Sequence, residues 1–157
     1  LATHHLGHLL CATPNDFYNA LVCNALGARF GRHRTLQLAT AEEAHSESRR
    51  LTADQRGHFA FGDTCDFNWL QERVDEGWTV QATRLAEDFG LDELSDRLGE
   101  PGQDWLLLGC VRPSGAPRLY SSELPFEPEN GWRVLYFAPG KEAGEAGEPA
   151  PENERAG

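Results

Sequence analysis

The stretch Thr13-Pro14-Asn15-Asp16 carries the side chains that are best placed in this sequence to contact a ligand. It follows an apolar run that is typical of a strand buried on both faces, and it leads into a helical pattern. Open α/β sheets bind ligands at this position, because the helix N-terminus offers free N–H groups to an anion or a ribose. Thr13, Asn15 and Asp16 are therefore candidate cofactor-binding residues. Asn and Asp are also preferred N-cap residues, and local capping is the stronger of the two interpretations.

The histidines near the start of the chain are candidate metal ligands. His4, His5 and His8 lie within five positions and Cys11 follows, but the paired spacings of zinc sites are missing. We expect these histidines to be exposed to solvent and no metal to be bound. The chain also has no GxSxG motif and no cysteine–histidine signature, so we expect it not to be an enzyme.

The four cysteines are spread along the chain without a CxxC pair. Each lies in an apolar or helical run, which favours buried free thiols in a reducing compartment such as the cytoplasm. They are Cys11, Cys23, Cys65 and Cys110.

Length and charge limit the function further. The 157 residues suffice for one domain or for two small modules, and 14 basic against 25 acidic residues give a net charge of −11. This surplus argues against binding to nucleic acid or to anionic lipid. Apolar runs are short, so no direct membrane insertion is expected. The chain has no Met and starts with Leu1, so we expect it to be a piece of a longer protein.

Hydrophobic periodicity predicts an α/β fold. The pattern of the first part predicts strand–helix–strand, which is a parallel βαβ crossover. Gly27 is predicted to end the helix. The second part has the order β-α-β-β-β, preceded by a helix with Phe67, Leu70 and Val74 on one stripe. The predicted strands are 8–13, 35–38, 58–61, 78–85, 104–111, 118–120 and 132–138, and the predicted helices are 16–26, 40–50, 66–76 and 91–98.

The order of these elements resembles a known family. His8-Leu-Leu-Cys-Ala-Thr-Pro-Asn-Asp16 followed by Asn19-Ala-Leu-Val22 is similar to the fourth strand and helix of a TrkA-N (RCK) domain. This Rossmann-like domain regulates potassium channels and cation/proton antiporters. The segment Phe30-Gly31-Arg32-His33 and the strand after it resemble the continuation seen in bacterial sodium/proton antiporters. The β-α-β-β-β part is similar to a TrkA-C module.

The resemblance implies a division of the chain and a fold class. We expect a partial Rossmann-like parallel βαβ unit followed by a small α+β module. The expected parts are the C-terminal half of a TrkA-N-like domain at residues 1–62, a connecting helix at 63–77, a TrkA-C-like module at 78–139 and a disordered acidic tail at 140–157.

The implied function is that of a cytosolic regulatory domain of a membrane sodium/proton antiporter, which gates transport by ligand binding or dimerisation. It would lie on the cytoplasmic side of the inner membrane. Its partners would be the transmembrane domain of the same polypeptide and a second copy, docked through helices 16–26 and 40–50. The family's glycine-rich loop would precede Leu1, so no cofactor is expected in this piece, and a nucleotide is a candidate effector of the whole protein.

Two alternatives remain open. One is a stand-alone nucleotide-binding regulatory subunit of a potassium channel or transporter. The other is the C-terminal part of a Rossmann oxidoreductase, which is less favoured because no Lys/His/Tyr constellation suited to hydride transfer follows the βαβ unit.

Overall fold

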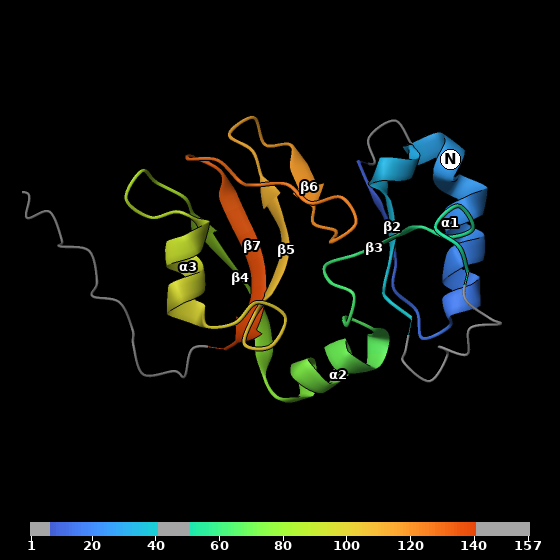
Figure 1. The fold of residues 1–157 in the computed structure, drawn as a ribbon, viewed down its shortest axis with the longest axis horizontal. Coiled ribbons are helices and arrows are strands. Elements are labelled where there is room, and N and C mark those ends of the chain that lie inside the picture. The colour runs from blue at the N-terminus through green and yellow to red at the C-terminus, as the bar shows by residue number, and fades with distance from the viewer. Residues whose placement is uncertain (1–6, 41–50, 141–157) are drawn as a thin grey trace, which may run out of the picture.

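A computed structural model describes residues 7–40 and 51–140 and arranges them as two neighbouring sheets (Figure 1). The predicted helix 40–50, the tail 140–157 and the histidines at positions 4 and 5 lie wholly or almost wholly outside these residues. The expected α/β fold is confirmed: a parallel three-stranded βαβ sheet comes first, and an antiparallel four-stranded module follows.

The first sheet contains three parallel strands in the order β1-β2-β3. Its elements are β1 (Leu9–Cys11), α1 (Asp16–Phe30), the 3-10 turn η1 (Arg32–Arg34), β2 (Thr35–Gln37) and β3 (His58–Phe59). The prediction that α1 stops at Gly27 was wrong. The helix continues to Gly31, which has a φ of 86° and donates its N–H to the Gly27 carbonyl at 2.8 Å. A left-handed residue at this position ends the helix, as a glycine can at little cost.

The second sheet is antiparallel, with the order β4-β7-β5-β6. Its elements are α2 (Phe67–Asp75), β4 (Trp78–Arg84), α3 (Leu91–Leu98), β5 (Leu106–Val111), β6 (Pro117–Leu119) and β7 (Arg133–Pro139). The predicted β-α-β-β-β order is therefore observed from β4 onward, and α2 lies within the segment 63–77 that was expected to connect the two parts.

One hydrophobic core is shared by the two sheets. It joins β2 and the segment after β3 to the middle strands of the second sheet, and its buried members are Leu36, Leu38, Ala60, Phe61, Cys65, Leu106 and Phe137. Helix α2 packs on this core through Trp69 and Leu70, and the Trp69 and Trp78 rings meet edge to face at 5.7 Å. Val74, which the stripe placed on the same face, is 54% exposed. A second core lies between α3 and the antiparallel sheet.

All four cysteines are buried and free, as the sequence predicted. Burial raises the pKa of the Cys23 and Cys65 thiols to about 12, so both are protonated thiols at neutral pH. They therefore act as small apolar side chains in the interior.

The carboxylate of Glu123 connects the loop after β6 to β3 and to the residues before it. Glu123, in the loop after β6, accepts two hydrogen bonds from the Arg56 guanidinium, at 2.6 and 2.9 Å, and one from the Phe59 N–H at 2.7 Å. Nearby, the Ser121 hydroxyl donates to the Phe59 carbonyl at 2.6 Å, and Ala60 forms an antiparallel bridge with Ser121. The loop after β6 is thus bonded to β3 and to the segments that flank it.

Glu123→Gln should lower the free energy of unfolding by about 2 kcal/mol at neutral pH, measured by chemical denaturation. The amide removes the charge that pairs with half-buried Arg56. Hydrogen bonding to Arg56, ahead of other causes, holds the pKa of Glu123 below its ordinary value. Its stabilisation is therefore present above the ordinary carboxyl pKa and is lost as the pH falls through the folded pKa. The difference between wild type and variant should shrink in acid.

The control is Glu127→Gln, because Glu127 is an exposed carboxylate in the same loop. We expect it to change stability by no more than about 0.5 kcal/mol. Equal losses for the two variants would contradict a special role for Glu123.

Candidate functional site

The predicted site residues lie together at the carboxyl end of β1 and the start of α1. Asn15 is the N-cap of α1, and its side-chain oxygen accepts the Tyr18 N–H at 2.9 Å. The Thr13 hydroxyl accepts the Asn15 N–H at 3.2 Å, and Asp16 occupies the first turn of the helix. A carboxylate there interacts favourably with the helix dipole. The same carboxylate would repel a phosphate, so the turn suits the hydroxyls of a ribose better than an anion.

Asn19 completes this turn, although the sequence analysis did not select it as a site residue. It is fully buried, its side-chain amide donates to the Thr13 carbonyl at 2.9 Å, and its oxygen accepts the Thr13 hydroxyl at 2.7 Å. A polar amide on the inner face of an apolar helix was the available sign of this role. The hydrogen bonds of Thr13, Asn15 and Asn19 fit capping of the helix, and ligand binding at the turn stays a prediction.

The outer face of α1 is apolar and exposed. Phe17, Tyr18 and Leu21 are 60%, 56% and 66% exposed. Figure 1 shows α1 on the side of the first sheet that faces away from the second sheet. The helix carries a single acid, Asp16, and a single base, Arg29, at its two ends. The middle of this face is therefore uncharged in a chain that is strongly acidic.

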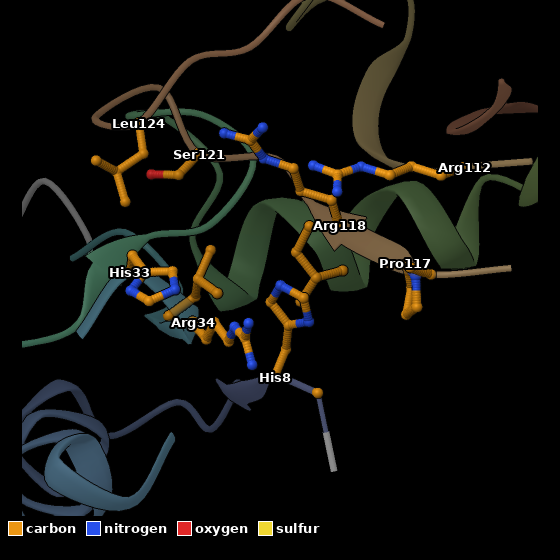
Figure 2. Close-up of a pocket in the computed structure, with 12 residues that line it drawn as sticks. His8, His33, Arg34, Arg112, Pro117, Arg118, Ser121 and Leu124 are labelled. Carbon is orange, nitrogen blue, oxygen red and sulfur yellow. The ribbon is translucent and has the colours of Figure 1, made fainter. Parts of the chain in front are cut away.

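A pocket of about 520 Å³ lies where the two sheets meet, and we call it the basic pocket. One wall consists of residues just before β1 and β2, namely His8, His33 and Arg34, and the other comes from the β5–β6 hairpin with Arg112 and Arg118 (Figure 2). None of the described residues that line it is acidic. The full lining is Gly7, His8, His33, Arg34, Leu36, Arg112, Ala116, Pro117, Arg118, Leu119, Ser121 and Leu124.

Aromatic rings, rather than carboxylates, hold two of these arginines. The Arg118 guanidinium lies 4.1 Å from the centre of the Phe126 ring, and that of Arg112 lies 5.2 Å from the Trp132 ring. Among residues 7–40 and 51–140, no carboxylate forms an ion pair with an arginine of the pocket. The positive charge of the pocket is therefore not neutralised from within the described part of the chain.

His8 experiences this charge directly. Burial, followed by the positive charges of Arg34, His33 and Arg118, lowers the pKa of His8 below its ordinary value. The expectation that His8 is solvent-exposed was wrong: it is half-buried in the pocket wall. Sequence reasoning missed the pocket because its charged residues come from three distant segments. The only local sign was the run Arg32-His33-Arg34.

Membrane-spanning helices and metal sites are both missing from the described residues. In the described part of the chain, no helix has the length and apolarity needed to cross a membrane. Within the same residues, no three His, Cys, Asp or Glu side chains converge as a metal site would require.

No protein-family model matches the chain, no curated protein sequence matches it significantly, and no solved structure is significantly similar to it.

Asn15→Ala should reduce the free energy of unfolding by about 1 kcal/mol, because it removes the acceptor for the Tyr18 N–H at the start of α1. Thermal or chemical unfolding measures the loss. Asn15→Asp keeps an acceptor at the cap and should stay close to wild type. An Asn15→Ala variant as stable as wild type would show that the cap is dispensable.

Proposed function

We propose that this chain is a cytosolic regulatory domain of a membrane sodium/proton antiporter that acts by ligand binding or by dimerisation. The order of elements supports this proposal, because a parallel βαβ unit is followed by a β-α-β-β-β antiparallel module, as the resemblance to TrkA-N and TrkA-C domains implies. Such a domain regulates a transporter only if its ligand or partner binds two conformations with different affinities. The domain would lie on the cytoplasmic side of the membrane and act on the transmembrane part of the same polypeptide.

The observation that carries the proposal is the uncovered apolar face of α1. Parallel sheets are normally covered on both faces, and large exposed apolar patches mark interaction sites. Here Phe17, Tyr18 and Leu21 are exposed together on the predicted dimer helix. The occupant is a second copy of this chain, because two copies that each carry a net charge of −11 repel each other least where the surface is uncharged.

The edge of the first sheet favours the same partner. In the described part of the chain, β1 pairs with β2 on one side only, and Leu10 on this edge is 37% exposed. Unpaired edges are prone to associate with another chain. A second copy over α1 would also protect this edge.

The alternative is a stand-alone regulatory subunit of a potassium channel or transporter. It would use the same fold and the same self-association, so the difference between the two proposals lies in whether the polypeptide also contains membrane-spanning segments. A C-terminal fragment of an oxidoreductase stays a weaker alternative.

The purified chain should form a concentration-dependent dimer, and Leu21→Glu should make it monomeric, because a carboxylate would be buried in an apolar interface. Light scattering after size exclusion and analytical ultracentrifugation measure the mass. Leu21 is exposed, so the variant should still unfold cooperatively and melt like wild type that has been diluted to the monomer, because only the stabilisation from association is lost. The control is Val80→Glu on β4, where an apolar side chain is 64% exposed on the other sheet, and this variant should stay dimeric. A wild-type chain that is monomeric at every concentration would contradict dimerisation.

In fractionated native cells, an antibody raised against this chain should detect a band in the membrane pellet. The mass of this band should be much larger than that of the 157-residue chain. This result is expected because the antiporter polypeptide would include the transmembrane helices. Fractionation followed by immunoblotting, with extraction in carbonate and in detergent, separates integral from peripheral proteins. A band of modest size in the soluble fraction would contradict the antiporter and favour the stand-alone subunit.

A further inference from the structure

The basic pocket and the predicted Thr13–Asp16 turn lie at opposite ends of β1. His8 precedes this strand and lines the pocket, whereas Thr13 follows it. The pocket is therefore a separate site, at the amino ends of the parallel strands, and the β5–β6 hairpin closes it from the other sheet.

The charge of the pocket is opposite to that of the protein. Three arginines and two histidines line the pocket, and none of its described lining residues is acidic. In the whole chain, by contrast, acidic residues outnumber basic ones 25 to 14. Elsewhere arginines do find carboxylates: Arg56 pairs with Glu123 and Arg73 with Glu76, both at 2.6 Å. Like charges placed together without counterions are unfavourable. A bound anion would remove this cost.

Two of the pocket's arginines lie beside aromatic rings. An aromatic ring under a guanidinium contacts its flat face and leaves the N–H groups at its edge available. The guanidinium carbons of Arg118 and Arg112 lie 4.1 and 5.2 Å from the ring centres of Phe126 and Trp132, within the range of such contacts. The planar fork of an arginine matches the oxygens of a phosphate, and a side chain that is already fixed loses little entropy on binding.

The volume of the pocket and its apolar lining residues indicate the size and the polarity of the ligand. About 520 Å³ lies in the range of small-molecule sites, which run from roughly 300 to 1,000 Å³, and exceeds the needs of a single inorganic phosphate. Leu119, Leu124 and Pro117 give the pocket an apolar part beside the arginines. The ligand should therefore combine an anionic group with an organic body.

We propose that the basic pocket binds a phosphate monoester, whose phosphate contacts Arg34, Arg112 and Arg118 and whose organic part rests on Leu119 and Leu124. Such a ligand touches the ends of β1 and β2 and the β5–β6 hairpin at once, so binding stabilises one arrangement of the two sheets. This inference rests on the pocket alone and does not depend on whether the chain belongs to an antiporter.

Binding should also respond to pH. A dianion in the pocket opposes the field of Arg34, His33 and Arg118 at His8 and so raises the pKa of this imidazole. Binding therefore takes up protons and tightens as the pH falls. Sulfate is a suitable probe for this effect because it keeps its double charge across the range, from about pH 8 to about pH 6, where a histidine titrates. In His8→Gln the pH dependence should be reduced.

Calorimetric titration of the purified chain with glycerol 3-phosphate, AMP and inorganic phosphate, at constant ionic strength in chloride, tests the proposal. We expect the two monoesters to bind more tightly than inorganic phosphate. Arg34→Gln should weaken monoester binding about tenfold, because one charge-assisted hydrogen bond is lost. Arg34 is exposed and has no ion pair in the described residues, so the variant should melt like wild type.

The matched control is Arg84→Gln, which removes the same charge from an exposed position on β4, away from the pocket. Its affinity for the monoesters should stay within about twofold of wild type. Equal affinities of Arg34→Gln and Arg84→Gln, or no heat with any of the three anions, would overturn the proposal. AMP binding that Asp16→Ala abolishes and Arg34→Gln leaves unchanged would place the nucleotide at the Thr13–Asp16 turn and would also overturn it.

Cosedimentation with vesicles distinguishes a soluble ligand from a lipid headgroup. Phosphatidic acid carries a phosphate monoester, whereas phosphatidylglycerol carries a diester. Binding to phosphatidic acid vesicles that Arg34→Gln weakens would support the same pocket with a lipid as the source. Equal binding of wild type and Arg34→Gln to both kinds of vesicle would reflect surface charge only and would count against the pocket.

Discussion

The carboxylate of Glu123 is the contact on which the arrangement of the two sheets depends. It satisfies the Arg56 guanidinium and the Phe59 N–H together, and it does so from a loop of the second sheet. A half-buried guanidinium without a counterion and a backbone N–H without an acceptor would each be costly. Glu123 removes both costs only when the loop after β6 lies against β3. This polar contact fixes an orientation that the shared apolar core, being non-directional, leaves less well defined.

The position of this loop determines where the β5–β6 hairpin lies. Ser121 and Leu124, on either side of Glu123, both line the basic pocket, and Arg118 lies only three residues before Ser121. The wall formed by His8, His33 and Arg34 belongs to the first sheet. The Glu123 contact, together with the Ser121–Phe59 hydrogen bond and the shared core, therefore holds the two walls of the pocket face to face. Glu123 pairs with Arg56 at this contact and is not among the residues that line the pocket, so the lining keeps an excess of positive charge.

Local sequence patterns predicted those elements whose limits are set locally. Helix α3 was predicted with the bounds that the structure has, because the Glu93 carboxylate accepts the Gly90 N–H at its start and Gly99, with a φ of 100°, ends it. The predicted end of α1 was wrong because Gly27 and Gly31 are equally good helix stops when only the local sequence is considered. Which of the two takes the left-handed conformation is decided by where β2 must begin.

Tertiary contacts explain the other differences. Of the stripe on α2, Phe67 and Leu70 pack against the shared core, whereas Val74 is 54% exposed. Trp69 packs there as well, and its ring meets Trp78 edge to face. The turn at Thr13–Asp16 could be predicted because strand end, cap and helix are contiguous. Its buried partner Asn19 was not selected, although an amide on the inner face of an otherwise apolar helix is a local sign of a hydrogen-bonding role.

The basic pocket shows most clearly what a single sequence leaves undetermined. His8, Arg34 and Arg118 come from three elements of two sheets, and no spacing rule relates them. Their proximity follows from long-range contacts between the two sheets, among them the shared core and the pair of Glu123 with Arg56. If an anion occupies the pocket, it adds a second contact between the same two sheets, close to the first. Ligand and ion pair would then favour the same arrangement, and each would strengthen the other by the same free energy. A change in the occupancy of the pocket is therefore a physically reasonable way for this domain to change the relation between its sheets.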